Sequence, residues 1–424
     1  MTYPNSSPRP RKLIIATLVS MSLLAGTVAP VTAHADIGDL IASLFFSSGR
    51  RMTVEMDSPA GQLKMKISGQ ATFTDAEDDM ASLTDKAYIQ QKRDGHVLRM
   101  NFEADGVGGI KRTYLVDGRV MPQGLESKRW MAEVVPTLFR ETAMDSAKRI
   151  RRIHGKGGAD AVLAEIDRIK ADYARRVYLE GLAQLGPLSE NQLHQMLASV
   201  ADIDSDFERR SAFSVITRTQ PLNASHQVAV LKTVTKMTSS FEQRGVLAAL
   251  MPKLASDADV MRAWVLAVAD IDSDFEMRSA IDALVKRDPT PLQIDAALQA
   301  TMHLDSSFEH ASALTGLAKL LGNATPAQVN AYLNSARKID SDFERRTALV
   351  ALLNRAKLDK AGYIDVLNAV SSMQSDFEMR TVLMAVAQKM PADGELVASY
   401  RRTARRLGDF ERGQAEKALD HLNL

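Results

Sequence analysis

The 424-residue sequence contains no cysteine, which excludes disulfides and a lipid-modified cysteine. Aromatic residues are scarce as well, at 5%. This composition suits helical cores of Ala, Leu, Val and Met better than a large β-sandwich. The formal net charge is only +1, which argues against a surface that coats nucleic acid in general. Hydrophobic residues make up 45% of the chain, so a folded protein is expected.

The first 35 residues have the pattern of a signal peptide. A positively charged leader that ends at Lys12 precedes an apolar stretch at 13–31. The small-x-small triplet that ends at Ala35 predicts cleavage between Ala35 and Asp36. An uncleaved anchor is the alternative, because about 19 apolar residues can just span a bilayer. We expect a periplasmic or secreted bacterial protein with no stable membrane span after removal of the signal.

Residues 36–125 are predicted to form a β-rich N-terminal domain. Leu63, Met65 and Ile67 alternate with polar residues, which is the period of a strand with one buried face. Asp-Gly dipeptides at 94–95, 105–106 and 117–118 mark turns about 12 residues apart. This pattern indicates an antiparallel β-meander of five or six strands.

The rest of the chain repeats with a period close to 34 residues. The octapeptide IDSDFERR at 203–210 returns at 339–346, and looser copies stand between and after them. A fixed period of this length indicates stacked units, each too small to bury its own apolar face. The aromatic residue of these copies recurs at steps of 34, 34, 33, 35 and 34 residues, at Phe207, Phe241, Phe275, Phe308, Phe343 and Phe377, and GDFERG extends the series to Phe410.

Each octapeptide has the composition of a helix start. A serine stands three residues before a glutamate, which is the capping box in which each side chain bonds to the other residue's backbone N–H. Each cap contributes about 1 kcal/mol. The predicted structural caps are Ser205 and Glu208, Ser239 and Glu242, Ser273 and Glu276, Ser306 and Glu309, Ser341 and Glu344, and Ser375 and Glu378.

Two helices are predicted in each repeat. After the first cap, Phe275, Ala280 and Ile281 begin an apolar stripe with helical spacing, which places the phenylalanine on the packed face. Thr290-Pro291 and Thr325-Pro326 predict the start of the second helix. The fold class is therefore α+β, mainly α: a right-handed-type, HEAT-like α-solenoid of helix pairs at 126–424, preceded by the small β-meander.

The acidic residues in and beside the octapeptide also raise the alternative of a metal-binding site. Asp202, Asp204 and Asp206 have the spacing that opens a calcium loop. Such a loop needs glycine at its sixth position and glutamate at its twelfth, where this chain has Phe207 and Phe213. The eight histidines show no metal-binding spacing. Neither a metal nor a cofactor is predicted.

Arginines recur four residues after the octapeptide aspartates. The plainer interpretation is an ion pair within each helix, which contributes about 0.2–0.5 kcal/mol. The alternative is a charged ladder that binds an anionic or carboxylate-bearing partner. The ladder consists of Arg176, Arg210, Arg244, Arg278, Arg346 and Arg380 with Asp172, Asp206, Asp274, Asp342 and Asp376.

Several segments resemble a family of uncharacterised bacterial extracytoplasmic modules. They include FTDAEDDMASL (73–83), TYLVDGRVMP (113–122) and WMAEVVP (130–136), and the family carries S-D-Y/F-E-R-R repeats like those of this chain. Related modules are found beside antirepressor metallopeptidases of the penicillin-sensing type. The zinc motif of those peptidases is absent from this sequence, so protease activity does not carry over.

These observations favour an exported, non-enzymatic scaffold that binds a protein or peptide partner in the cell envelope. A part in envelope or stress sensing is a further hypothesis for this scaffold. No nucleic-acid partner is expected, and the oligomeric state is left open. An envelope hydrolase with its site at the junction of the β-domain and the solenoid is the competing hypothesis. Binding of an anionic polymer through the arginines is a third.

Overall fold

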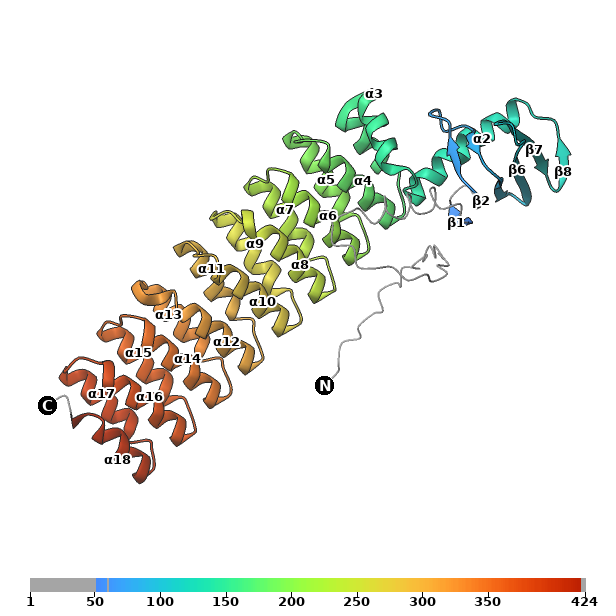
Figure 1. Cartoon of the computed structure of the whole chain (residues 1–424). Coiled ribbons are helices and arrows are strands. Elements are labelled where there is room, and N and C mark those ends of the chain that lie inside the picture. The colour runs from blue at the N-terminus through green and yellow to red at the C-terminus, as the bar shows by residue number, and fades with distance from the viewer. Residues whose placement is uncertain (1–50, 59–60, 421–424) are drawn as a thin grey trace, which may run out of the picture. The chain divides into compact units, whose positions relative to one another are not determined.

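The computed structural model describes residues 51–58 and 61–420, where eight strands are followed by 17 helices (Figure 1). The predicted class, α+β and mainly α, is confirmed. The chain divides into two compact units, Met1–Leu182 and Ala183–Leu424. The predicted domain boundary was at 125/126, where strands give way to helices, whereas the division between the two units lies at 182/183. The signal peptide and its cleavage site at Ala35/Asp36 lie outside the described residues.

The first unit contains a six-stranded antiparallel sheet in the order β1-β2-β5-β6-β7-β8, and a separate β3–β4 hairpin between β2 and β5. The meander is thus as predicted, with one hairpin more than the sequence pattern showed. The strands are β1 (Met52–Ser58), β2 (Gly61–Ser68), β3 (Ala71–Phe73), β4 (Met80–Leu83), β5 (Lys86–Arg93), β6 (His96–Ala104), β7 (Ile110–Val116) and β8 (Arg119–Met121).

Two of the Asp-Gly dipeptides form two-residue hairpin turns. Asp94 and Gly95 join β5 to β6, and both have positive φ, at 51° and 85°. Asp117 and Gly118 join β7 to β8 in the same way. Positive φ at both central residues is the turn geometry that matches the twist of paired strands.

One face of the sheet packs against helix α2. Leu63, Met65 and Ile67 are at most 2% exposed, as their alternation predicted. They share a core with Trp130 and with other apolar residues of helix α2. This common core explains why helices belong to the same compact unit as the sheet. The helices here are α2 (Leu125–Thr142), α3 (Ser146–Ile166) and the start of α4 (Asp172–Gln184).

After the end of α4, the described residues of the second unit form seven helix pairs in two layers. Each even-numbered helix from α6 to α16 packs against the next even-numbered one, and each odd-numbered helix from α5 to α15 against the next odd-numbered one (Figure 1). The even layer comprises α6 (Asp206–Thr219), α8 (Ser240–Leu250), α10 (Asp274–Val285), α12 (Ser307–Ala318), α14 (Asp342–Arg355), α16 (Asp376–Lys389) and α18 (Asp409–Lys417). The odd layer comprises α5 (Glu190–Ala201), α7 (Ala224–Val234), α9 (Ala258–Ala269), α11 (Pro291–Thr301), α13 (Pro326–Ala336), α15 (Lys360–Ser371) and α17 (Gly394–Ala404).

The odd-numbered helices begin where the sequence predicted. Thr290 and Thr325 are N-caps, each followed by proline, and both form reciprocal capping boxes with a glutamine. Leucines and isoleucines of both layers form the core between the pairs, as Ile281 and Leu349 do at 0% exposure. A solenoid of helix pairs is confirmed in this unit. Within the described part of the chain, no helix has the length and apolar character that crossing a membrane requires.

Candidate functional site: a phenylalanine row on the repeat array

The octapeptide serines cap the even-numbered helices. In α6, the Ser205 hydroxyl accepts a hydrogen bond from the backbone N–H of Glu208. The N···O distance is 3.4 Å in α6 and also in α14, where Ser341 accepts from Glu344, so these bonds are long. The predicted serine caps are confirmed in six helices, with Ser205, Ser239, Ser273, Ser306, Ser341 and Ser375 as N-caps.

The octapeptide aspartates bond to the following repeat. Asp206 Oδ2 accepts from the backbone N–H groups of Thr238 and Ser239, at 2.7 and 2.9 Å. Burial alone would raise the pKa of Asp206, but these bonds outweigh burial and lower the pKa. Asp342 accepts from the equivalent groups of Gln374 and Ser375, both at 2.7 Å. Each aspartate therefore stabilises the start of the next even-numbered helix.

Serine makes the same contact where it replaces aspartate. Ser240 Oγ accepts from the N–H of Ser273 at 3.3 Å, and Ser307 Oγ accepts from that of Ser341 at 3.2 Å. Asp274 bonds to Ser306 N at 2.6 Å, and Asp376 bonds to Gly408 N at 2.9 Å. The contact is thus a property of the repeat position.

The arginines pair with the glutamate of the following repeat. Arg244 Nε lies 2.7 Å from Glu276 Oε2. The prediction of ion pairs within each helix is therefore wrong for the pairs Asp206/Arg210, Asp274/Arg278, Asp342/Arg346 and Asp376/Arg380, because both members contact the next repeat. The predicted bond from the glutamate back to the backbone of its own cap is also wrong in α8, α10, α12 and α16, where the carboxylate pairs with the arginine of the preceding repeat. The inter-repeat ion pairs are Arg210–Glu242, Arg244–Glu276, Arg278–Glu309, Arg346–Glu378 and Arg380–Glu411.

Each of these guanidinium groups also lies over the octapeptide phenylalanine of its own helix. Arg346 Cζ lies 4.5 Å from the centroid of the Phe343 ring, and Arg210 lies 5.2 Å from that of Phe207. In the first unit, Arg176 lies over Tyr173 at 5.1 Å and pairs with Glu180 at 2.8 Å. Cation–π contact and ion pairing together orient each arginine.

The octapeptide phenylalanines are exposed, contrary to their predicted place on the packed face. Phe275 is 55% exposed, whereas Ala280 and Ile281 are at most 2% exposed. The sequence spacing could have revealed this exposure, because Phe275 and Ala280 are five positions apart, whereas members of a helical stripe are three or four apart. We call the set the phenylalanine row; its members are 52–70% exposed: Phe207, Phe241, Phe275, Phe308, Phe343, Phe377 and Phe410.

The phenylalanine row continues where the arginine is missing. Ala311 and Gly413 stand at the arginine position of α12 and α18. Phe308 and Phe410 are nevertheless present, and they are 61% and 70% exposed. A purely structural role as a platform for arginine does not account for these two rings. Phe308 lines a hollow of about 690 Å³ together with Phe343 and Glu344.

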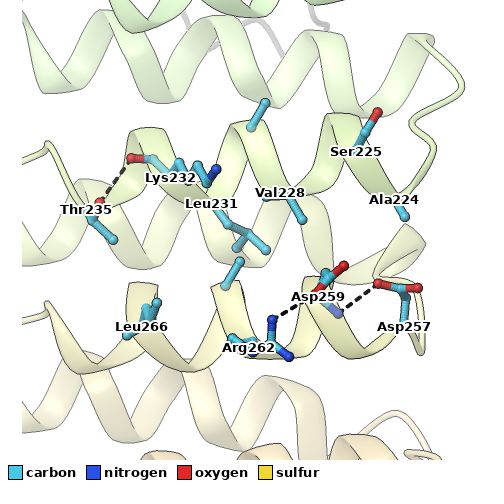
Figure 2. Close-up of a pocket in the computed structure, with 12 residues that line it drawn as sticks. Ala224, Ser225, Val228, Leu231, Lys232, Thr235, Asp257, Asp259, Arg262 and Leu266 are labelled. Atoms are coloured by element: carbon cyan, nitrogen blue, oxygen red, sulfur yellow. Dashed lines mark hydrogen bonds and ion pairs between the residues drawn. The ribbon is translucent and has the colours of Figure 1, made fainter.

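A second groove lies on the odd-numbered layer. It has a volume of about 760 Å³ between α7 and α9 (Figure 2). Both of its carboxylates are already paired, since Asp259 Oδ1 accepts from Arg262 at 2.8 Å and Asp257 accepts from two backbone N–H groups. This groove has no aromatic lining residue among those that the structure describes.

Charged residues are buried together in the first unit. Arg149 pairs with Glu77 at 2.7 Å and with Glu165 at 2.9 Å, and it donates to the Tyr178 hydroxyl at 2.9 Å. Arg140 pairs with Glu165 at 2.6 Å. All of these side chains are less than one-tenth exposed. We call Glu77, Arg140, Arg149 and Glu165 the buried charge cluster.

A groove of about 560 Å³ beside Trp130 is the place in the first unit where the hypothesis of an envelope hydrolase can be examined. Glu126, Glu133 and His96 line it, so carboxylates and an imidazole are available. The hydrogen bond that His96 donates to the Asp117 carboxylate raises the pKa of His96, which is exposed. Trp130 itself is packed, with its indole N–H donating to Gln91 at 2.8 Å. The described lining residues include no serine or threonine that could act as a nucleophile beside the imidazole.

The structure brings three potential metal ligands together in one place. Among the described residues, one group of at least three histidine, aspartate or glutamate side chains can converge on an ion: Glu190, His194 and His226. The sequence contained part of this signal, because Glu190 and His194 are four apart and so share a helical face. The aspartates of the calcium pattern are not in such a group, and Asp206 bonds to backbone N–H groups.

A comparison with models of known protein families finds no match. A comparison with curated proteins finds no similar sequence either.

Proposed function

We propose that this protein is an exported, non-enzymatic scaffold of the bacterial cell envelope, and that its phenylalanine row docks an extended segment of another protein. The observation that carries the proposal is the recurrence of one exposed aromatic ring per repeat at the same position. Isolated exposed apolar residues are ordinary on a protein surface, but a contiguous apolar patch marks an interaction site. The even-numbered helices pack in sequence, so these rings belong to neighbouring helices.

The spacing of the row favours one kind of segment. Packed helices have axes about 8–10 Å apart, so successive rings are separated by roughly that distance. A polyproline II helix advances about 3.1 Å per residue, or about 9 Å in three residues. Its side chains at every third position would meet successive phenylalanines. Aromatic surfaces are known to bind proline-rich segments in this conformation. The proposed partner segment is therefore proline-rich, with an apolar side chain at every third residue.

The arginines contribute a polar border to this surface. Each is held by a glutamate of the next repeat, so its charge is balanced before any partner binds. Docking on the row should accordingly depend only weakly on salt. Binding of an anionic polymer through the arginines would instead weaken steeply as salt is added.

The cellular setting of the proposal rests on the sequence. The signal-peptide pattern supports export, and the resemblance to extracytoplasmic modules beside penicillin-sensing-type antirepressors supports a role in envelope or stress sensing. The competing hydrolase hypothesis predicts turnover of an envelope substrate that depends on the groove beside Trp130. The scaffold hypothesis predicts a stable complex instead.

Photo-crosslinking in the native host tests the proposal. A photoreactive phenylalanine analogue would replace Phe241 or Phe308, and a matched control would carry it at Leu266, which is 60% exposed on the odd-numbered layer. We expect the same envelope protein at both row positions, cross-linked through a proline-rich segment, and no such product at Leu266. Equal labelling at all three positions would contradict docking on the row, as would no cross-link anywhere together with turnover of a defined substrate.

A further inference from the structure

The cluster of Glu190, His194 and His226 lies at the contact of α5 and α7, away from the phenylalanine row. Glu190 and His194 are one turn apart on α5, and His226 is in the first turn of α7. The ligand atoms of the three side chains all lie within 4.8 Å of one another. His226 is 3% exposed, whereas the other two side chains are accessible from solvent.

The hydrogen bonds around the two imidazoles do not satisfy both rings. The backbone N–H of Asn223 donates to His226 Nδ1 at 3.3 Å, which leaves the proton of a neutral His226 on Nε2. This Nε2 lies 3.0 Å from His194 Nδ1, which in turn lies 2.9 Å from the carbonyl oxygen of Glu190. If His194 Nδ1 carries a proton, two N–H groups face each other. If it carries none, its lone pair faces a carbonyl oxygen.

A metal ion removes this conflict. The lone pairs of His194 Nδ1 and His226 Nε2 would both point to the ion. The proton of His226 would then be on Nδ1, and the 3.3 Å hydrogen bond from the Asn223 N–H to this nitrogen would be lost. Zinc binds imidazole nitrogen at about 2.0–2.1 Å, and so two nitrogens on one tetrahedral zinc are about 3.3 Å apart. The observed separation of 3.0 Å between the two nitrogens is within a few tenths of an ångström of this value.

We propose that Glu190, His194 and His226 form a binding site for a divalent transition-metal ion of the zinc type, which fastens α5 to α7. Two imidazoles and one carboxylate are a donor set that zinc uses in proteins, with the fourth position left to water. Calcium and magnesium prefer oxygen ligands, so they are not expected here. Asn223 Nδ2 lies 3.2 Å from Glu190 Oε1 and helps to orient that carboxylate.

The site lends itself to substitutions that leave the helices intact. Gln192 stands 34 residues before His226, at the same position of its helix, and it forms a capping box there. His226→Gln should therefore keep the cap of α7 while removing a ligand. His194→Gln changes an exposed residue. His303→Gln is the matched control, because His303 is exposed and belongs to no such cluster among the described residues.

Titration calorimetry of the full, untagged protein with zinc chloride is the test. We expect one ion per chain, a higher melting temperature with zinc, and at least tenfold weaker binding in His194→Gln and His226→Gln, with His303→Gln unchanged. Equal binding by all four proteins, or no binding at micromolar zinc, would overturn the site. Calcium binding that depends on the same residues would overturn the assigned class of metal. The phenylalanine row is not involved, so failure here leaves the proposed scaffold untouched.

Discussion

The two compact units of this protein use charged residues in opposite ways. In the first unit, Arg149 joins Glu77, 72 residues earlier in the chain, to Glu165 in a single buried charge cluster. In the second unit, a recurring ion pair joins one repeat to the next, as Arg244 and Glu276 do across 32 residues. Within the part of the chain that the structure describes, the first arrangement occurs once, and the second recurs along the array. Loss of one charge should therefore damage the first unit as a whole, but only one interface of the second.

The most severe effect is expected from Arg149→Ala. The substitution leaves Glu77 and Glu165 buried with fewer partners, and breaking a buried ion pair in this way costs about 3–5 kcal/mol. Hydrogen exchange of the sheet amides would report the loss as a lower free energy of unfolding of the first unit. Arg168→Ala is the control, because Arg168 is 66% exposed and its pair with Glu165 should contribute little. Similar effects of both substitutions would remove the contrast between the units.

A buried histidine should make the second unit sensitive to acid. Burial, reinforced by Lys338 and opposed by Asp274 and Asp305, lowers the pKa of His310 from 6.5 to about 4. Below pH 6.5 the unfolded chain binds a proton that the folded chain does not, so the free energy of unfolding decreases as the pH is lowered. The loss is about 1.4 kcal/mol per pH unit down to the folded pKa, or about 3 kcal/mol in total.

The contribution of His310 can be isolated with His310→Gln. In the wild-type protein the Ser335 hydroxyl lies 2.6 Å from His310 Nε2, and glutamine retains a polar partner for it. Urea unfolding of both proteins at several pH values from 7 to 4 gives the comparison. The difference between wild type and variant should change along this range. A constant difference would show that His310 does not titrate as its burial predicts.

A single cap in the array should matter less. Ser341→Ala removes the acceptor for the Glu344 N–H, and a helix cap contributes about 1 kcal/mol. The 3.4 Å bond places this serine at the lower end of the range. We expect a slightly lower melting temperature in thermal unfolding, and no effect of added calcium on either protein. A rise in the melting temperature with calcium would contradict the capping role.

The smallest effect is expected where the array lacks an arginine. Ala311→Arg would restore the pair with Glu344 and the contact with Phe308, and it should stabilise the unit by about 0.5 kcal/mol. A double-mutant cycle with Glu344→Ala isolates the coupling. If Ala311→Arg stabilises the unit equally in the wild-type and the Glu344→Ala backgrounds, the ion pair does not hold neighbouring repeats together.

Features that depend on local geometry could be predicted from the sequence. Alternating Leu63, Met65 and Ile67 predicted a buried strand face, and the Thr-Pro dipeptides predicted helix starts, because each rule involves only neighbouring residues. The 34-residue period also predicted the stacking of helix pairs. These predictions are confirmed.

The partners of the charged side chains could not be predicted in the same way. Asp206 and Arg210 have the spacing of a pair within one helix, yet each finds a better partner in the next repeat, where backbone N–H groups and a half-buried carboxylate are available. The exposure of Phe275 could have been predicted, since its spacing from Ala280 is not helical. The buried charge cluster required the fold, because nothing in the sequence relates Glu77 to Arg149.

The proposed docking on the phenylalanine row is tested most directly by the affinity for the cross-linked proline-rich segment. Phe241, Phe275 and Phe308 would be changed together to alanine, and the control would change three exposed leucines, Leu185, Leu266 and Leu292. Three rings that become buried on binding should lower the affinity of the first variant by about 100-fold or more, with little change in its melting temperature. Equal affinity of the two triple variants would contradict the account.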